Sequence, residues 1–568
     1  MTLRALGRWL LAWAVVTAVA CLAVHRAFAL RVDEAHPRAV VASVWAGGQL
    51  VARAVLAHAG DRDATLDAAL ASHPRATRVD ESVVGEGPVV AWPEAALAMS
   101  FVPGRDGAAA ILGGRTAYAT PDDLLSRQAY DKGIHVPSLA LSVGVDAPLV
   151  LGLLAEQLGT TARDLLDHGT VRRIRVVRTL PGAPPPRVVT AETITDDDVS
   201  DGAIAAGRYL ARGVDAEGRF RYLVDAPTDR TLPGYDWPRH AGATYFLAQI
   251  AALTHDPDVA YATLRAASHL RDHAMVRCGP HRCIGDGAVV DVGSTALAVL
   301  AFVEVARAQL DPGYALVVPE LTAFLREQQR PDGEFMHLYD RGAGRPMDVQ
   351  LLYYSGEAAL ALSRAHRLLG DARDLDAARR ALAHLVGPAW SFFGSRYYWG
   401  EEHWTCQAMD DLWDRAPSPA ALDFCLAWQA YGRKLMYGPG DTPFDADGAY
   451  GFGPVVTPRL TPSGSRSEAG LATLEAARRA GRPEAELAPL EHQMRRSLAM
   501  LLRHQLHPGQ KHLFVDPAAV DGALPGSEVD WQLRIDYAQH TGSALVRWLE
   551  LRAARAPQNG GGAQPGAN

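Results

Sequence analysis

The chain has 568 residues, a hydrophobic content of 48% and a formal net charge of −8 at pH 7. This length predicts more than one domain, and the apolar content is sufficient for large buried cores. The acidic balance, and the lack of any run of Lys and Arg interleaved with aromatic residues, exclude a nucleic-acid partner.

The N-terminal segment, residues 1–29, has the pattern of a signal peptide or membrane anchor helix. Arg4 and Arg8 precede an apolar run over residues 9–24, and residues 27–29 (AFA) offer a small-x-small cleavage site. The run is shorter than the about 20 residues of a full membrane span. We expect the rest of the chain to be periplasmic or extracellular, either released or anchored to the cytoplasmic membrane through the apolar run. The alternative is a buried N-terminal helix.

Residues 30–180 are predicted to form a smaller α/β (α+β) domain of unknown role. Apolar, strand-like runs flank Gly-Gly turns at 47–48 and 113–114, and a Thr-Pro-Asp sequence at 120–122 has the pattern of a capped helix start. The domain has neither a Walker loop nor a GxGxxG sequence, so nucleotide binding has no support. Residues 181–195, which begin PGAPPP, are a stiff proline-rich linker to the next domain.

Residues 196–555 contain six segments of one design. Each segment opens with a charged, aromatic or hydroxylic cluster and continues as a helix rich in Ala, Gly, Ser and Leu, and a more polar helix follows it. Starts roughly 50–70 residues apart are typical of a repeat architecture. The pattern predicts a mainly α domain, an (α/α)6 toroid whose opening clusters meet at one end, followed by a disordered tail at 556–568. The six segments are 237–249, 291–302, 353–364, 401–413, 465–477 and 535–548.

Turns that contain Gly next to acidic residues recur between the predicted helices, at 217–220, 329–335 and 447–452. They are good turn signals and weak catalytic ones. Among the five cysteines, Cys278 and Cys283 flank a Gly-Pro turn and are predicted to form a local disulfide, with free thiols as the alternative. The remaining cysteines of the helical region are interpreted as helix-face residues.

The opening clusters carry the residue types of a sugar-binding cleft. Flat rings stack on pyranose faces, carboxylates act as acid, base or nucleophile, and arginines bind anionic groups in a bidentate manner. The alternatives for the same residues are helix caps or a buried ion-pair network that locks the repeat ends together. The predicted catalytic residues are Tyr353, Tyr354, Glu357, Glu402, His403 and Asp536. The predicted substrate-binding residues are Trp237, Arg239, His240, Tyr245, Trp399, Trp404, Arg466, Glu468, Arg534 and His540.

One acidic sequence needs separate interpretation. Asp410, Asp411 and Asp414 satisfy the DDxxD spacing with which class I terpene synthases bind magnesium and diphosphate. The sequence lies near the end of a predicted inner helix, and no partner metal motif follows downstream. We interpret it as a coincidence in an acidic helix or as a cap, and we predict neither a metal nor another cofactor.

The region from about 200 to 553 resembles the α/α-toroid superfamily, which includes terpenoid cyclase and prenyltransferase toroids and several carbohydrate-active groups. The sequence YYSGEAALAL at 353–362, followed by LLGD at 368–371, is similar to the helix pairs of epimerase-like and glucuronyl C5-epimerase-like toroids. This resemblance covers the architecture and no catalytic string. Together with the N-terminal signal or anchor pattern and the sugar-binding residue types of the opening clusters, it indicates an exported carbohydrate-active hydrolase, lyase or epimerase that acts on a cell-envelope or extracellular polysaccharide. The alternatives are a non-catalytic envelope scaffold or glycan-binding toroid and, third, a terpenoid-cyclase-like enzyme.

Overall fold

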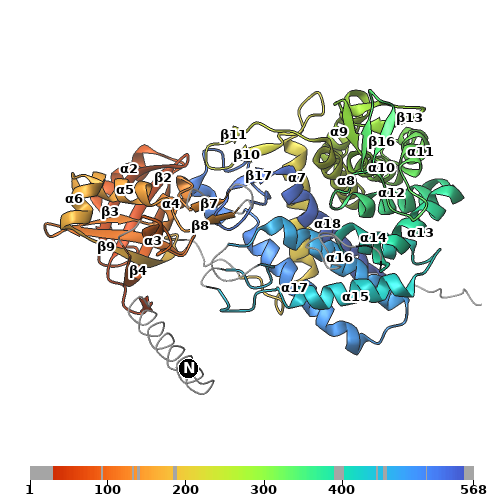
Figure 1. Ribbon diagram of the computed structural model, residues 1–568. Helices are drawn as coiled ribbons and strands as arrows, with labels where there is room; N and C mark the ends of the chain where they lie inside the picture. The colour runs from red at the N-terminus through yellow and green to blue at the C-terminus, as the bar shows by residue number, and fades with distance from the viewer. Residues whose placement is uncertain are drawn as a thin grey trace, which may run out of the picture.

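The computed structural model describes most of the chain between residues 30 and 555. The described ranges are 30–90, 94–130, 134–136, 141–182, 188–388, 390, 402–442, 445–451, 457–506 and 508–555. The predicted signal or anchor segment, the predicted tail and Trp399 lie outside these ranges. Within them, none of the helices has both the length and the apolar character that crossing a membrane requires. Figure 1 shows two units, a sheet-based domain on the left and a ring of helices on the right.

The N-terminal domain is built on one antiparallel sheet with strand order β3-β2-β4-β9-β5-β6, and β1 pairs with β4. The Gly-Gly sequences predicted as turns connect β2 to β3 and β5 to β6, with positive φ at both glycines of each turn. Thr120 caps α4 through a capping box, as the sequence predicts. The antiparallel sheet with its helices is the α+β form of the predicted domain. The strands are β1 (Arg31–Val32), β2 (Val40–Ala46), β3 (Gln49–Leu56), β4 (Thr77–Pro88), β5 (Asp106–Leu112), β6 (Arg115–Ala119) and β9 (Thr170–Thr179), with a separate hairpin of β7 (Ile134–Val136) and β8 (Leu141–Val143); the helices are α2 (Ala64–Ser72), α3 (Glu94–Ala98), α4 (Pro121–Ser126), α5 (Ala147–Leu158) and α6 (Ala162–His168).

The second unit is the predicted (α/α)6 toroid. In the described part of the chain, each inner helix packs against the next one, and α18 packs against α8, which closes the ring. All six segments predicted from the sequence are inner helices. The inner helices are α8 (Trp237–Thr254), α10 (Val292–Arg307), α12 (Tyr354–Leu369), α14 (Glu402–Leu412), α16 (Leu460–Arg479) and α18 (Ile535–Arg555); the outer helices are α7 (Asp196–Arg212), α9 (Pro257–Ala274), α11 (Val318–Glu327), α13 (Ala372–Val386), α15 (Pro419–Arg433) and α17 (Glu484–His504).

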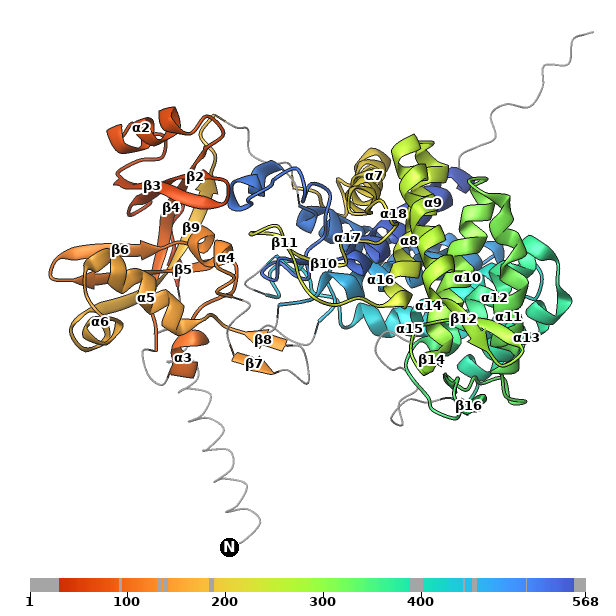
Figure 2. The same ribbon diagram turned by 90° about the horizontal axis from the view of Figure 1, so that it is seen from above.

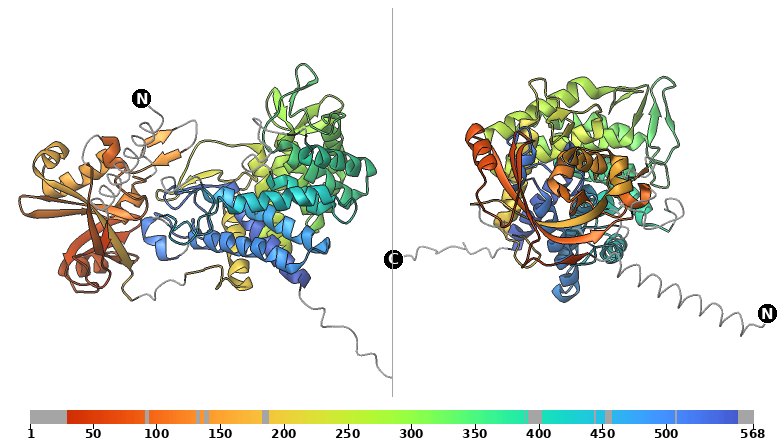
Figure 3. Two further views of the ribbon diagram at one scale, coloured as in Figure 1. Left: turned by 60° about the horizontal axis from the view of Figure 1, so that its bottom comes forward. Right: turned by 90° about the vertical axis from the view of Figure 1, so that its left-hand side faces the viewer.

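The difference between the two rings follows from burial. Nearly every residue of α10 is buried because this helix is enclosed by its inner neighbours and by the outer ring. An outer helix such as α13 has one apolar face and one charged, exposed face. Figure 2, which is seen from above, and Figure 3 show the ring and the sheet domain from further sides.

The recurring glycine turns position the repeats. Gly218, Gly333 and Gly448 have φ values of 86°, 96° and 91°. A Cβ atom on them would lie 2.1, 2.3 and 2.2 Å from a carbonyl oxygen of α9, α13 and α17, respectively. Only glycine therefore permits this close approach of the turn to the outer helix. The aromatic residue two positions after each glycine is buried, so each turn also contributes to the core.

Short strands connect the helices at the end of the ring where the inner helices begin. Strand β14 leads directly into α10, and β17 leads into α18. The pairing of β10 with β17 joins the first and last repeats. The short elements are β10 (Leu223–Asp225), β11 (Arg230–Thr231), β12 (Met275–Cys278), β13 (His281–Ile284), β14 (Val289–Asp291), β15 (Leu338–Asp340), β16 (Arg345–Met347), β17 (Gln532–Arg534) and the 3-10 helices η2 (Pro312–Leu316) and η3 (Pro508–Leu513).

Two disulfides stabilise the helical unit. Cys278 and Cys283 are bonded across the β12–β13 hairpin, which confirms the predicted local disulfide. Cys406 and Cys425 lie on helices as predicted, but they are also bonded to each other and link inner helix α14 to outer helix α15.

The two units contact each other through a buried polar pair. His512 Nε2 lies 2.8 Å from the carboxylate of Asp122 at the start of α4, and both side chains are almost fully buried. The ring of Trp45 meets the His512 ring edge at a centroid distance of 6.0 Å. The sheet domain is thus held against the loop between α17 and α18.

Candidate functional site

A cavity of about 790 Å³ opens at the end of the ring where the inner helices begin. We call it the front cavity. Its described lining includes residues at the start of all six inner helices, so the polar clusters recognised in the sequence converge in space. The predicted site residues that line it are Arg239, Tyr353, Tyr354, Glu357, His403, Trp404, Arg466, Arg534, Asp536 and His540.

Three other predicted site residues, Glu402, Trp237 and His240, lie behind or beside this cavity. Glu402 is buried and paired with Arg466, with 3.3 Å between carboxylate oxygen and Nε. Trp237 lines an adjacent pocket. His240 is buried beneath it, where its ring nitrogens contact the Tyr235 hydroxyl and the backbone oxygen of Ala266.

The centre of the front cavity is a group of two histidines held by one carboxylate. Glu468 on α16 accepts hydrogen bonds from His403 Nε2 on α14 at 2.6 Å and from His540 Nδ1 on α18 at 2.9 Å. The two imidazole rings lie 4.9 Å apart in an edge-on arrangement. Glu468 is buried, whereas both rings line the cavity, so the carboxylate fixes the orientation of two cavity-lining imidazoles.

The electrostatics of this group favour a charged carboxylate and a neutral ring. Burial lowers the pKa of His403 and outweighs the opposite effect of Glu468. Burial acts to raise the pKa of Glu468, but the positive charge that His403 can carry and the hydrogen bonds from both histidines bring that pKa below its usual value. His403 is therefore available as a base at neutral pH. The three residues also have the donor types of a divalent metal site, with ligand atoms within 4.8 Å of one another.

Two carboxylates of the cavity wall, Asp236 and Asp536, are paired with arginines of the same wall. Asp536 accepts hydrogen bonds from Arg534 Nε at 2.6 Å and Nη2 at 2.9 Å, and from Arg239 Nε at 3.2 Å. Burial acts to raise the pKa of Asp536, but the two guanidinium groups lower it overall. Asp536 therefore remains ionised and holds two arginines in place. Among the described lining residues, four arginines face four carboxylates, so the cavity has no excess of positive charge.

Two further carboxylates, Asp236 and Asp291, were not selected from the sequence. They cap α8 and α10, and the Asp291 carboxylate accepts hydrogen bonds from the Ser294 N–H at 2.6 Å and hydroxyl at 2.9 Å. Burial raises the pKa of Asp291, and the nearby charge of Asp236 acts in the same direction. An aspartate before an apolar helix is expected as a cap, so the only signal was its position in front of a predicted inner helix.

The backbone at the start of α12 is strained where it meets the cavity. Tyr353 has a φ of 78°, which is rare for an aromatic residue, and its side chain lines the cavity beside Tyr354. Such strain is concentrated at functional sites in proteins. Burial and the charges of Asp291 and Glu357 raise the pKa of Tyr354, so its hydroxyl stays protonated and can donate a hydrogen bond.

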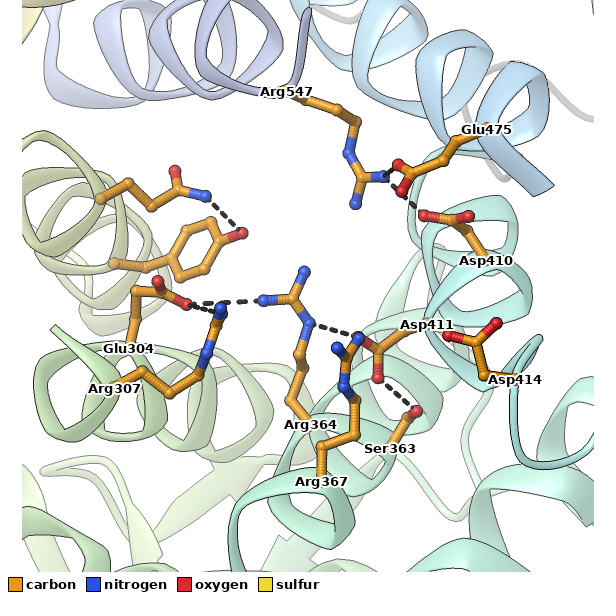
Figure 4. A network of polar contacts seen from close by, with 12 residues as sticks. Glu304, Arg307, Ser363, Arg364, Arg367, Asp410, Asp411, Asp414, Glu475 and Arg547 are labelled. Atoms are coloured by element: carbon orange, nitrogen blue, oxygen red, sulfur yellow. Dashed lines mark hydrogen bonds and ion pairs between the residues drawn. The ribbon is translucent and has the colours of Figure 1, made fainter. Parts of the chain in front are cut away.

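The opposite end of the ring contains a second, charged cavity of about 380 Å³, which we call the rear cavity. Figure 4 shows its ion pairs. Arg364 Nε and Arg367 Nη1 both lie 2.7 Å from the Asp411 carboxylate, and Arg547 Nη1 lies 2.6 Å from that of Asp410. Tyr245, predicted as a substrate-binding residue, lies here and not in the front cavity.

These ion pairs explain the DDxxD sequence. Asp410 also accepts from Arg479, which bonds Asp414 at 2.9 Å as well. Burial raises the pKa of Asp410 to about 6 in spite of its arginine partners. Arginine already compensates each carboxylate, so the arrangement does not favour a magnesium and diphosphate site of the terpenoid-cyclase kind.

No protein-family model matches the chain, and no curated protein matches it. Similar solved structures include a D-mannose isomerase (12% identity, 62% of this chain and 97% of that chain, TM-score 0.48) and cellobiose 2-epimerase from Bacillus thermoamylovorans (10%, 62% and 98%, 0.47). An unsaturated glucuronyl hydrolase from Streptococcus agalactiae is also similar (12%, 64% and 98%, 0.46). All three are α/α-toroid carbohydrate-active enzymes, the class that the sequence resembles. At these identities and TM-scores, no residue role or activity is transferred to this chain.

Proposed function

We propose that the chain is an enzyme that acts on a carbohydrate by general acid–base catalysis in the front cavity. The observation that carries this proposal is the His403–Glu468–His540 group, in which one buried carboxylate orients two imidazoles toward the cavity. A general base in an enzyme needs a fixed orientation and an unprotonated ring nitrogen, and His403 has both because Glu468 holds its ring and burial lowers its pKa.

The cavity wall supports a sugar as the ligand. Its volume lies within the range of small-molecule sites. The indole of Trp404 lies beside the His403 ring, at a centroid distance of 4.1 Å, and provides an apolar face next to the proton-transferring group. Carboxylates and arginines in equal number offer hydrogen-bond acceptors and donors without an excess of positive charge, which suits the hydroxyl groups of a neutral sugar.

The reaction that fits two adjacent imidazoles is epimerisation or isomerisation. A neutral ring nitrogen removes the proton from the carbon next to the carbonyl of the open-chain sugar. The electron pair of that C–H bond forms the carbon–carbon double bond of an enediolate, and the π pair of the carbonyl moves onto its oxygen. A protonated ring then returns a proton to the other face of the same carbon, or to the neighbouring carbon. No other reactant is consumed, and the product is an isomer of the substrate.

Hydrolysis is the second candidate because of one specific observation. Burial raises the pKa of Asp291 and so favours its protonated form, and Asp236 at the start of the neighbouring helix also lines the cavity. A protonated carboxyl and an ionised carboxylate on either side of a glycosidic bond are what a glycosidase requires.

One experiment separates these reactions. The full-length protein is incubated with neutral mono- and disaccharides in D2O and, separately, in 18O-labelled water, and products are followed by NMR and mass spectrometry. Epimerisation or isomerisation is supported if the unaltered chain incorporates carbon-bound deuterium into the sugar. His403→Gln and His540→Gln should lose this incorporation, and the rear-side control His366→Gln should keep it. New reducing ends that carry 18O and disappear in Asp291→Asn support hydrolysis.

The same experiment also tests the non-catalytic alternative. Sugar binding without turnover, equal in all variants, would replace the enzyme proposal with a glycan-binding toroid. If the unaltered chain shows no sugar binding and no turnover, the carbohydrate proposal itself is refuted.

We also propose that the protein works outside the cytoplasm, on an envelope or extracellular glycan. The N-terminal signal or anchor pattern and the two disulfides support this location, because structural disulfides persist in oxidising compartments. Fractionation of cells that express the full-length chain tests it, and recovery of the protein with reduced cysteines in the cytoplasm would contradict it.

A further inference from the structure

A second pocket, of about 310 Å³, lies directly beside the front cavity. We call it the side pocket. It shares Asp236, Pro238 and Asp291 with the front cavity, so the two spaces meet along the starts of α8 and α10. Its remaining walls come from the residues just before α8, from the loop at 285–290 and from the outer helix α9. A ligand in the front cavity therefore has an adjoining space into which it can extend.

The aromatic wall of the side pocket is held in place by packing. The Trp237 ring lies 5.8 Å from the Tyr235 ring and 5.9 Å from the His269 ring. The Arg219 guanidinium carbon lies over the Tyr235 ring, 4.3 Å from its centroid. Burial lowers the pKa of His269, so this ring is a neutral part of the wall. The indole of Trp237 is partly exposed and lines the pocket, which makes it a preformed platform for a flat ligand face.

The charges of the side pocket differ from those of the front cavity. Three carboxylates, those of Asp236, Asp286 and Asp291, line the side pocket together with one guanidinium, that of Arg219. Asp286 is exposed on the loop before β14. Carboxylates accept hydrogen bonds from hydroxyl groups and repel anions, so this pocket suits a neutral pyranose and disfavours a uronic acid.

We infer that the side pocket binds a second, neutral pyranose ring stacked on Trp237, so that the substrate is a disaccharide or a longer neutral glycan. This inference rests on the proposed function, because it places the reacting ring beside His403 and His540. The glycosidic oxygen between the two rings then lies next to Asp236 and Asp291, the carboxylates that both spaces share.

Calorimetric binding to the full-length protein tests this inference. The probes are glucose, mannose and N-acetylglucosamine, their β-1,4-linked disaccharides, and glucuronic acid. The variants are Trp237→Ala and Asp286→Ala; the second changes an exposed loop residue and leaves the fold intact. The matched control is Tyr261→Ala, which removes an exposed aromatic ring on α9 that lines neither cavity.

We expect the unaltered chain to bind at least one disaccharide about tenfold more tightly than its monosaccharide, which corresponds to about 1.4 kcal/mol. Both side-pocket variants should remove this gain and leave the affinity for the monosaccharide unchanged, and the control should change neither affinity. Equal affinity of the unaltered chain for monosaccharide and disaccharide, or equal loss of both in the variants, would overturn the side-pocket inference alone. No binding of any sugar to the unaltered chain would overturn the proposed function and this inference with it.

Discussion

Replacing Glu468 with Gln tests the role of the His403–Glu468–His540 group most directly. The substitution keeps the shape of the side chain but removes the charge that accepts hydrogen bonds at 2.6 and 2.9 Å from the two imidazoles. Both imidazoles donate to the same carboxylate oxygen, so a Gln side chain keeps both contacts only when its amide oxygen takes that position. The two contacts are then neutral hydrogen bonds instead of charge-assisted ones, and both rings are held less firmly.

The expected size of the effect follows from these contacts. Hydrogen bonds to a charged group contribute about 1.5–3 kcal/mol each and neutral ones about 0.5–1.5 kcal/mol, so loss of the charge at both contacts should lower the free energy of unfolding by about 2–3 kcal/mol. General acid–base catalysis contributes about 10²–10⁴-fold, so we expect kcat to fall about 10²-fold because the bases remain but are less firmly oriented. Glu468 raises the pKa of His403 against the effect of burial. Without that charge, the acid limb of the pH–rate profile should move to lower pH.

The measurement is the rate of proton exchange into the sugar in D2O as a function of pH, together with urea denaturation. Glu475→Gln is the matched control, because Glu475 lies two turns further along the same helix and pairs with Arg547 in the rear cavity. We expect this control to keep the rate and the pH profile of the unaltered chain. If Glu468→Gln also keeps both, Glu468 does not orient the histidines for proton transfer and the reasoning is wrong.

Three further predictions concern stability. Breaking a buried ion pair costs about 3–5 kcal/mol, so Asp411→Asn should lower the free energy of unfolding, measured in urea, by about that amount. If magnesium diphosphate stabilises the unaltered chain, our interpretation of the rear cavity as an ion-pair network is wrong. Loss of the disulfide in Cys425→Ala should cost about 3 kcal/mol by loop-closure entropy, and an unchanged Tm would show that the bond does not form in solution. Gly333→Ala should lower Tm strongly because its Cβ would lie 2.3 Å from a carbonyl oxygen, whereas Gly370→Ala, where φ is 77° but the space is open, should lower Tm less.

The ring could be predicted from the sequence because its close helix packing requires small residues at regularly spaced positions. Inner helices approach one another so closely that small residues are required at the contacts. A Cβ on Gly356 would lie 3.0 Å from the side chain of Trp404, and one on Gly464 would lie 3.0 Å from the backbone nitrogen of Thr541. Repetition of such positions at a regular spacing predicts a closed helical repeat without knowledge of any single contact.

The individual pairings of the site could not be predicted, because they join residues far apart in the chain. His403 and His540 lie 65 and 72 residues from Glu468, and only the closed ring brings the three together. Tyr245 was predicted to bind substrate with the opening clusters, but it lies in the rear cavity. It belongs to a segment with a polar start, but a helix rises about 1.5 Å per residue, so this side chain lies about two turns from that start. The segment pattern alone therefore does not tell whether a residue lines the front or the rear cavity.

The ion pairs of the rear cavity bear on the geometry of the front cavity. Asp411 links α14 to α12, and Asp410 links α14 to α16 and α18. Helices α14, α16 and α18 carry His403, Glu468 and His540 nearer their N-terminal ends, and Glu468 also lines the rear cavity. A helix is a stiff rod and the interior is closely packed, so cross-links at one end restrict displacement at the other. The buried charges at the rear therefore serve a positional purpose: they hold three helices in the register at which one carboxylate reaches two imidazoles.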